Sequence, residues 1–437
     1  MLMTNIAILF TEQPQQSRHS RPGATPASVA WALALSCWVS VCAAEPVRVA
    51  TFNLALYDSA SGEILERLNG GNDPQACALA EIIQRARPQI LVLNEIDYDA
   101  EGAVLAAFCD KYLAVPQNVS QSAAPAKSIT FPHRMAFASN TGEHSGVDLD
   151  KNGDVDATLG SRSYAGDCYG YGVYPGEYAF AVLSQYPIDK AAVREFRKFL
   201  WKDMPGAQLP DDAATPEPGD WYSPEILAAF RLSSKNHCDV PVDVNGRVIH
   251  LLLSHPTPPV FDGPEDRNGR RNHDELRFWT DYISAATYFT DDNGHRGGLA
   301  DLQPPASSLQ PSFIILGDLN GDAFDGAGKE GIAALLASPR ILKYPMPTSQ
   351  GAVEAARLQA GANASQAGPH NQDTEDAADE RGPGNLHLDY ILPSSDLKVV
   401  ASGVFWPEST DALAALVAGA EHPASSDHRL VWIDLAW

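Results

Sequence analysis

The chain has 437 residues, with 31 lysines and arginines against 55 aspartates and glutamates, so its formal net charge is −24. A hydrophobic fraction of 44% is enough for a sizeable core, and 33 glycines and 32 prolines are too few for a collagen-like or wholly disordered chain. The acidity argues against a protein whose main affinity is for a polyanion, because nucleic-acid binding draws most of its strength from Lys and Arg.

The first 44 residues have the pattern of a secretory signal peptide. Arg18 and Arg21 precede an apolar run, 29–42, which two alanines follow. This run is shorter than the ~20 residues that a membrane-spanning helix needs. We therefore expect a signal peptide at 1–44, a single mature domain at 45–437 and a secreted or periplasmic location without stable membrane insertion. A buried helix or a short membrane anchor is the alternative.

The cysteines of the mature chain agree with export. Four remain after the signal segment, an even number in an oxidising compartment, which predicts disulfides. We favour the pairs Cys77 with Cys109 and Cys168 with Cys238, and four separate buried thiols are the alternative. No Cys-x-x-Cys pattern is present, which argues against zinc.

Strand-like and helix-like segments alternate along the mature chain. Helices are expected at 74–87, 272–289 and 329–337. Many apolar strands with few long helices predict an α/β fold of two packed sheets with helices outside. The expected strands are 47–54, 89–94, 134–139, 178–184, 240–244, 247–254, 312–316, 387–392, 399–405 and 428–435.

Three polar stretches interrupt this pattern. We interpret 117–177, 198–224 and 350–385 as long loop insertions in one domain, because no linker rich in Ser or Pro divides the chain.

Polar residues recur where the expected strands end or begin. Side chains at such positions converge on one edge of a sheet, where sites are commonly built. Taken singly, each also fits a turn former, a cap or a buried histidine with satisfied hydrogen bonds. Together they form a set that these interpretations explain poorly: Asn53, Glu95, His255, Asp318, Asn320, Asp389, Asp427 and His428.

This set points to phosphoester hydrolysis assisted by a hard cation. Glu95 is the expected direct ligand of Mg²⁺ or Mn²⁺, with Asn53 and Asp427 close by, because hard cations take oxygen ligands. A neutral imidazole held by a carboxylate can deprotonate water, and the expected pair is His428 with Asp389.

His255 and Asn320 are the expected donors to the phosphoryl oxygens, because the charge that develops there needs uncharged or cationic donors.

The motifs occur in the order of the endonuclease/exonuclease/phosphatase superfamily, which the chain resembles from about residue 47 to residue 436. That superfamily includes pancreatic-type deoxyribonucleases, abasic-site endonucleases, sphingomyelinases and inositol polyphosphate phosphatases. The resemblance implies a four-layer α/β sandwich, in which two mixed sheets are flanked by helices. The motifs are Thr51-Phe52-Asn53, Asn94-Glu95, Ser254-His255, Gly317-Asp318-Leu319-Asn320, Leu388-Asp389-Tyr390 and Ser426-Asp427-His428.

The resemblance also implies roles for the matching residues. Asp318 and Asn320 resemble the pair that positions the nucleophile and the phosphate. Asn53, Glu95 and Asp427 resemble metal-site residues, and His428 with Asp389 resembles the general base and its orienting carboxylate. His255 resembles the second histidine of the deoxyribonuclease branch, whose carboxylate partner would be Glu177.

Two segments depart from that pattern. The long loop after His255 carries Arg267, Arg270 and Arg271, which we expect to bind substrate phosphate, with solvated charges as the alternative.

Residues 148–156 place oxygen side chains at alternate positions with Gly at the sixth, as in a calcium loop. The twelfth position is Leu159 rather than Glu, so an Asp/Asn-rich turn is the alternative to structural Ca²⁺. The expected ligands are Asp148, Asp150, Asn152, Asp154 and Asp156.

The sequence thus predicts a secreted, metal-dependent phosphodiesterase or phosphatase that acts by in-line attack of water. Its partner would be a phosphate-ester substrate, which could be a small molecule, a lipid or a nucleic acid; no protein partner is implied. The alternatives are an extracellular nuclease of the same fold and a catalytically silent, calcium-dependent binding module.

Overall fold

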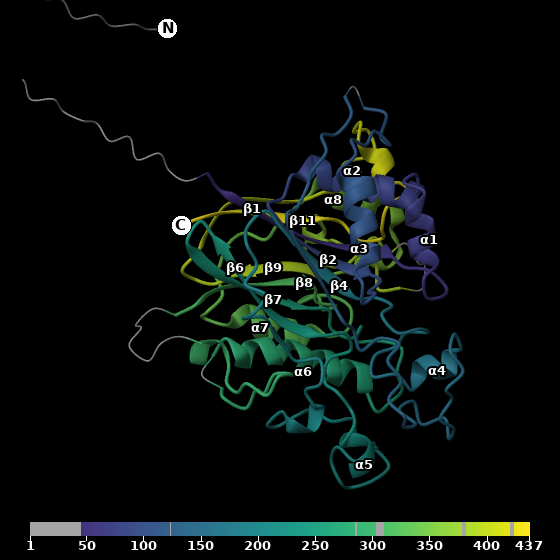
Figure 1. Ribbon diagram of the computed structural model, residues 1–437. Helices are drawn as coiled ribbons and strands as arrows, with labels where there is room; N and C mark the ends of the chain where they lie inside the picture. Colours follow the sequence, from purple (N-terminus) through teal and green to yellow (C-terminus); the bar gives the residue numbers. More distant parts are fainter. Residues whose placement is uncertain (1–44, 123, 285, 303–309, 378–381, 420–423) are drawn as a thin grey trace, which may run out of the picture. The chain divides into compact units, whose positions relative to one another are not determined.

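Two mixed β-sheets lie face to face at the centre of the fold (Figure 1). The computed structural model describes residues 45–437 except 123, 285, 303–309, 378–381 and 420–423, and the expected signal peptide lies outside this part. Ala44–Trp437 forms one compact unit.

The first sheet has six strands and the second has five. The order in the first is β10-β11-β1-β2-β4-β3, with β1 (Val47–Leu56), β2 (Ile90–Ile96), β3 (His133–Phe137), β4 (Phe180–Ser184), β10 (Lys398–Val404) and β11 (Val431–Ala436). The order in the second is β5-β6-β7-β8-β9, with β5 (Arg194–Glu195), β6 (His237–Val244), β7 (Arg247–Ser254), β8 (Ser312–Asp318) and β9 (Asp389–Pro393).

Helices cover the outer faces of the stacked sheets. Figure 1 shows α2 and α3 on the side of the first sheet and α6 and α7 on the side of the second. The predicted four-layer α/β sandwich is therefore confirmed. The helices are α1 (Glu63–Asn69), α2 (Pro74–Ala86), α3 (Ala103–Phe108), α4 (Arg162–Gly166), α5 (Pro224–Leu227), α6 (Arg267–Tyr282), α7 (Lys329–Ala337) and α8 (Gln350–Gln359). None of the described helices combines the length and apolarity needed to span a bilayer.

Strand β8 is buried on both faces, and its side chains alternate between the two cores. Ile314 and Leu316 belong to the core shared with the first sheet, whereas Phe313 and Ile315 belong to the core under α6. A strand covered on both faces reads as a continuous apolar run, which is what 313–316 shows.

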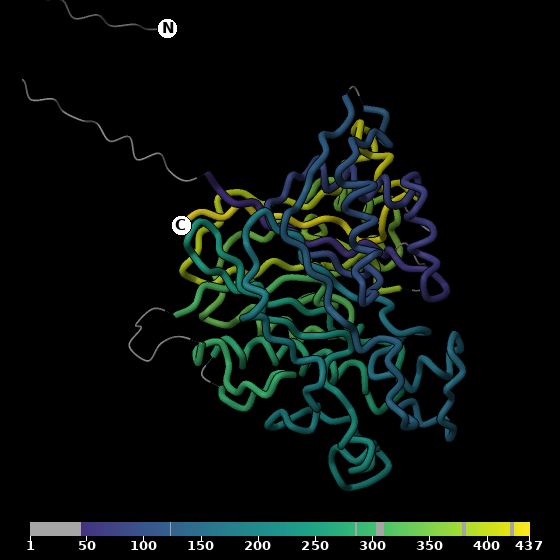
Figure 2. Tube along the Cα trace, viewed as in Figure 1, coloured from purple at the N-terminus to yellow at the C-terminus, as the bar shows by residue number. Residues whose placement is uncertain are grey.

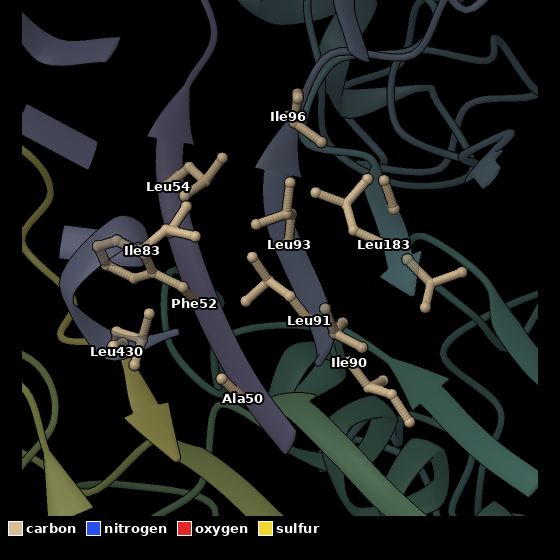
Figure 3. Close-up of a cluster of buried hydrophobic side chains, with 14 of the residues drawn as sticks. Ala50, Phe52, Leu54, Ile83, Ile90, Leu91, Leu93, Ile96, Leu183 and Leu430 are labelled. Carbon is tan, nitrogen blue, oxygen red and sulfur yellow. The ribbon is translucent and has the colours of Figure 1, made fainter. Parts of the chain in front are cut away.

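The two ends of the described chain lie next to each other in the first sheet. β1 and β11 pair antiparallel, as the purple and yellow segments of Figure 2 show. The outer face of β1 is covered by α2, and Figure 3 shows Ile83 of this helix beside Phe52 and Leu54 of the strand. The opposite face of β1 therefore points toward the second sheet and carries Asn53.

Most expected strands are present with shifted ends. The boundary that matters for the site is the start of a helix. The helix predicted at 272–289 spans Arg267–Tyr282. The three arginines expected in a loop therefore lie in the first turns of α6.

Short helices such as α1 and α3 were not predicted, because their few residues give too little periodicity. The insertion expected at 117–177 contains β3, an edge strand of the first sheet.

The predicted disulfides are wrong, since all four cysteines of the described chain are free. Cys238 lies on β6 in the core between the sheets, while Cys168 follows α4 and its thiol donates to the carbonyl of Tyr164 at 3.2 Å. Burial raises the pKa of Cys109 to about 11 and that of Cys168 to about 12. Three of the four thiols are buried and that of Cys77 is half-buried, and burial favours their protonated form. The alternative of separate thiols is therefore correct except for the burial of Cys77.

Candidate active site

Polar side chains gather at one edge of the stacked sheets. β1 and β2 run parallel, with Asn53 opposite Asn94, so Glu95 at the end of β2 lies at the same edge. In the second sheet β8 ends where the antiparallel β9 begins, and Asp318 pairs with Asp389 across them. The predicted convergence of strand ends is therefore present. We call Asn53, Glu95, His255, Asp318, Asp389 and His428 the edge site.

His428 and Asp389 form the expected pair. The Nδ1 atom of His428 lies 2.8 Å from Oδ2 of Asp389, and both side chains are buried. The opposite ring atom, Nε2, lies 3.7 Å from Oδ2 of Asp318. Burial lowers the pKa of His428, but the carboxylates of Asp389, Asp318 and Asp427 outweigh burial and raise this pKa well above its ordinary value.

The segment before β11 is fixed to β1 by a serine. The Ser426 hydroxyl donates to the carbonyl of Asn53 at 2.8 Å and accepts from the backbone N–H of His428 at 3.0 Å. Arg429, fully buried, donates to the Ser426 carbonyl at 2.6 Å and to Asp376 at 2.6 Å. These bonds restrict where the imidazole can lie.

Asp318 lies at the centre of the edge site. Its Oδ2 accepts from the Asn53 amide at 3.0 Å and lies 3.3 Å from Nε2 of His255. Its Oδ1 accepts from the backbone N–H of Asn320 at 3.0 Å. Burial opposes ionisation, but His255 and His428 outweigh it and lower the pKa of Asp318 below the usual range. Asp318 is therefore a carboxylate with several fixed donors.

Glu95 reaches the site through an unusual backbone. Asn94 contacts the second sheet, since its Oδ1 accepts from the Asp318 N–H at 3.3 Å, so regular alternation would turn the next side chain outward. Glu95 instead has φ 52, in the left-handed region, where non-glycine residues are uncommon. Its Oε1 lies 3.8 Å from Nε2 of His255.

The donor set of the edge site fits a divalent cation. Ligand atoms of Glu95, His255 and Asp318 all lie within 4.8 Å of one another. The Glu95 side chain is 21% exposed, so an ion can reach it from solvent. Asp427 is exposed beside this group, and together with Glu95 it raises the pKa of the half-buried Tyr57 hydroxyl, after the larger effect of burial. The carboxylate oxygens of this group suit a hard divalent cation.

The predicted partnership of His255 with Glu177 is wrong. Glu177 Oε2 accepts from the backbone N–H of Val173 at 2.6 Å, and its carboxylate also bonds to Tyr178. Nδ1 of His255 is buried and has no hydrogen-bond partner among the described residues. Tyr178 has φ 55, so the chain turns between Glu177 and β4. The Glu177 carboxylate is therefore bonded to neighbouring residues of its own loop.

Asn320 lies at the edge but is only partly free to act as expected. Its Nδ2 donates to the Pro256 carbonyl at 3.1 Å, and its backbone has φ 48, which Asn tolerates. This amide joins the end of β8 to the loop after His255. It does not offer both of its N–H groups to a substrate.

A cavity of about 720 Å³ adjoins Glu95. Its volume is in the range of small-molecule sites, roughly 300–1,000 Å³. The wall combines cationic, acidic and aromatic side chains from α6, the loop after β7 and the region before β4. Its lining includes Glu95, Asp150, Arg162, Tyr171, Tyr178, Phe230, Lys235, Phe261, Arg267 and Arg271.

Two of the three predicted arginines line this cavity. Arg267 and Arg271 are four residues apart on α6 and share a face, whereas Arg270 points elsewhere and donates to the Leu209 carbonyl at 2.9 Å. The expectation for Arg270 assumed a loop, and it is wrong because the helix begins at Arg267.

Lys235 was missed by the sequence analysis. It precedes β6, is only 6% exposed and faces the cavity. Burial lowers the pKa of its ammonium, against the attraction of Glu95, Glu275 and Asp318. A lysine between polar residues before a strand carries no pattern of its own, so only the fold reveals its position.

The expected calcium loop brings three carboxylates together. Oxygen atoms of Asp148, Asp150 and Asp167 lie within 4.8 Å of one another, although Asp167 was not among the predicted ligands. Asp154 and Asp156 instead accept hydrogen bonds from neighbouring groups of the same loop. The amide of the remaining predicted ligand, Asn152, donates to Asp150 at 3.1 Å. Structural Ca²⁺ stays a prediction.

Several solved structures resemble the chain at low sequence identity. An endonuclease/exonuclease/phosphatase from Beutenbergia cavernae DSM 12333 is 16% identical over 90% of this chain and 72% of its own, with a TM-score of 0.44. A family protein from Leptotrichia buccalis C-1013-b is 14% identical over 90% of this chain and 100% of its own, with a TM-score of 0.42. Sphingomyelinase C from Streptomyces griseocarneus is 13% identical over 89% of this chain and 99% of its own, with a TM-score of 0.38.

The curated proteins contain no match to this sequence. The model of the Endonuclease/Exonuclease/phosphatase family, in contrast, matches residues 50–428 and thus every residue of the edge site. The chain belongs to the Endonuclease/Exonuclease/phosphatase family.

Proposed function

We propose that the chain is a metal-dependent phosphoester hydrolase with His428 as its general base. Members of its family are typically hydrolases of phosphoesters. The observation that carries the proposal is the line of three buried groups, in which Asp389 lies 2.8 Å from Nδ1 of His428 and Asp318 lies 3.7 Å from Nε2.

Glu95 and Asp318 would hold Mg²⁺ or Mn²⁺, with Asn53, His255 and Asp427 around them. A bound divalent cation neutralises phosphate charge and stabilises the leaving oxygen. The buried face of His255 strengthens its electrostatic effect on a phosphoryl oxygen, because little water surrounds the ring.

The proton transfer follows from the hydrogen bonds of His428. Asp389 accepts the Nδ1 proton, so Nε2 faces Asp318 and the reaction side. A cation held by the neighbouring carboxylates would offset the charges that raise the pKa of His428 and so favour the unprotonated Nε2 that a general base needs. Water oriented by Asp318 gives its proton to Nε2 as its oxygen bonds to phosphorus. The bond from phosphorus to the leaving oxygen breaks on the opposite side, and solvent protonates that oxygen.

We also propose export, on the sequence of residues 1–44 alone. Of the alternatives, a silent binding module is disfavoured because both Glu95 and the His428–Asp389 pair are present. An extracellular nuclease remains the second candidate, and the assay below distinguishes it.

A panel of three substrates tests the proposal. Purified residues 45–437 are expected to hydrolyse bis-p-nitrophenyl phosphate, p-nitrophenyl phosphate or plasmid DNA with Mg²⁺ or Mn²⁺, and EDTA is expected to abolish the activity. The preferred substrate separates diester, monoester and nucleic-acid chemistry. Inactivity on all three with both metals, or full activity in EDTA, would contradict the proposal.

A further inference from the structure

The cavity beside Glu95 is cationic, although the whole chain has a formal charge of −24. Its wall holds four cationic side chains, Arg162, Lys235, Arg267 and Arg271, and two acidic ones, Glu95 and Asp150. A concentration of positive charge in a concave site attracts anions more strongly than the same charges on an open surface. The charge of this wall is therefore opposite to that of the protein around it.

Lys235 is the most informative of the four cations. Its side chain is buried, yet its ammonium forms no hydrogen bond or ion pair with the residues that the structure describes. The nearby carboxylate of Glu275 is used elsewhere, since it accepts from the backbone N–H groups of Ser234 and Thr257, both at 2.6 Å. Because the side chain is only 6% exposed and lines the cavity, the open side of the ammonium faces the cavity, where an anion can pair with it.

The two arginines of α6 are fixed in place before any ligand binds. Arg267 donates to the Leu149 carbonyl at 3.1 Å, and Arg271 donates through Nε to Leu232 at 2.7 Å and through Nη2 to Arg231 at 3.0 Å. Nη1 of Arg271 forms no hydrogen bond with the described residues. Guanidinium groups held in this way keep their charge at the wall and need little reordering on binding.

The two acidic residues of the wall offset only part of this charge, since they face four cationic side chains. Glu95 belongs to the cation site, and Asp150 accepts from both the backbone and side-chain amides of Asn152, at 3.0 and 3.1 Å. Arg162 is exposed and forms no hydrogen bond or ion pair with the described residues, so it remains available to a ligand.

We propose that this cavity selects small phosphoesters that carry a second phosphate group, with one phosphate at the edge site and the other at Lys235 and the α6 arginines. The inference rests on the proposed function, because it places the cleaved phosphate beside Glu95. The cavity volume of about 720 Å³ suits a nucleotide-sized ligand. Tyr171 and Phe261, at 57% and 87% exposure, border it and offer faces for a planar group.

A matched pair of ligands tests this proposal. Adenosine 3′,5′-bisphosphate and adenosine 5′-phosphate differ by one phosphate, and each is measured as a competitive inhibitor of the hydrolysis of bis-p-nitrophenyl phosphate at fixed free Mg²⁺. The wild-type protein is expected to bind the bisphosphate at least about tenfold more tightly, because charge-assisted hydrogen bonds to Arg and Lys are strong. Arg162→Gln and Arg267→Gln are each expected to reduce this ratio at least threefold.

Arg277→Gln is the matched control. Arg277 also lies on α6 and donates to loop carbonyls, those of Pro205 and Gly206, but it does not line the cavity. Its replacement is expected to leave the ratio unchanged. Arg162→Gln keeps the test valid if Arg267→Gln does not fold, because Arg162 is exposed and forms no hydrogen bond or ion pair with the described residues.

Calorimetric titration of both nucleotides in EDTA repeats the comparison without any reaction. If no phosphoester is hydrolysed but the bisphosphate still binds at least tenfold more tightly, the proposed function fails and the cavity assignment stands. Equal affinities, including no binding of either nucleotide, would overturn the assignment. A bisphosphate preference that is unchanged in both cavity variants would also overturn the assignment. Efficient plasmid cleavage with equal affinities for the two nucleotides would overturn it too, and would indicate a groove for nucleic acid instead.

Discussion

The edge site and the cavity beside it are built in different ways. The edge site comes from strand ends, so the pairing of β1 with β2 and of β8 with β9 fixes Asn53, Glu95, Asp318 and Asp389. The cavity comes from a helix and long loops, and its two α6 arginines are held by backbone carbonyls such as those of Leu149 and Leu232. We therefore expect changes in the edge site to affect kcat and changes in the cavity to affect KM.

The largest expected effect belongs to the residue that orients the base. Asp389→Asn is expected to lower kcat by about 10³-fold with little change in KM, because the amide cannot hold His428 in the required tautomer. Steady-state kinetics on the preferred substrate measure both constants. Asp239→Asn is the control. Asp239 lies 2.7 Å from Nδ1 of His250 in a similar pair, and this pair is not part of the edge site. An equal loss of kcat in both variants would remove the distinction.

The next largest effect is expected in Glu95→Gln, which should weaken metal binding. Loss of one carboxylate charge from the cation site is expected to raise the half-saturating concentration of Mg²⁺ by about 100-fold. Activity measured against free Mg²⁺ gives this value. Glu330→Gln, on the exposed side of α7, is the control. A Mg²⁺ dependence that does not change in Glu95→Gln would exclude Glu95 as a ligand.

The support of the cavity wall is expected to weaken in acid. His237 joins β6 to α6 through the Glu275 carbonyl at 2.9 Å, and burial lowers its pKa to about 4 from 6.5. The unfolded chain therefore binds this proton at a higher pH than the folded chain does. The contribution of neutral His237 to the free energy of unfolding is fully present above pH 6.5. It is lost as the pH falls to about 4, by up to about 3 kcal/mol.

Urea unfolding between pH 7 and 4 measures this loss. His237→Gln is expected to flatten the pH dependence of the unfolding free energy, whereas His295→Gln, whose side chain is 76% exposed, is expected to leave it as in the wild type. Equal slopes in the His237 variant and the wild type would exclude His237 as the source.

The smallest expected effect belongs to the border of the cavity. Phe261 is 87% exposed and has φ 66, so it is held in a backbone conformation that a bulky residue rarely adopts. Phe261→Ala is expected to raise KM about threefold without changing kcat, because only part of one aromatic contact is lost. Leu358→Ala is the control, because this side chain on α8 is 62% exposed. A fall in kcat would show that the border acts on the reaction itself.

The edge site could be predicted from sequence because strand ends are readable. Alternating or continuous apolar runs locate each strand, and parallel neighbours share an edge, so Asn53 and Glu95 could be placed together. Asp318 joins them from the end of β8 in the second sheet, where its carboxylate accepts from the Asn53 amide. The family resemblance assigned His428 and Asp389 to each other, and they lie 2.8 Å apart.

The errors arose where tertiary contacts decide. Glu177 precedes β4 directly in sequence, but a left-handed turn at Tyr178 engages its carboxylate away from His255. Arg270 was grouped with its neighbours because the start of α6 at Arg267 was not anticipated. Lys235 carries no local pattern, and the cysteine pairs failed because an even count does not fix distance.

The most direct test of the account is chemical rescue of His428→Ala. The account predicts that this variant keeps its fold, loses at least about 100-fold in kcat with saturating Mg²⁺, and regains part of that activity when imidazole is added, because free imidazole can replace the missing base. A variant with the full wild-type rate would contradict the central claim, and so would a folded, inactive variant that imidazole does not rescue at any concentration.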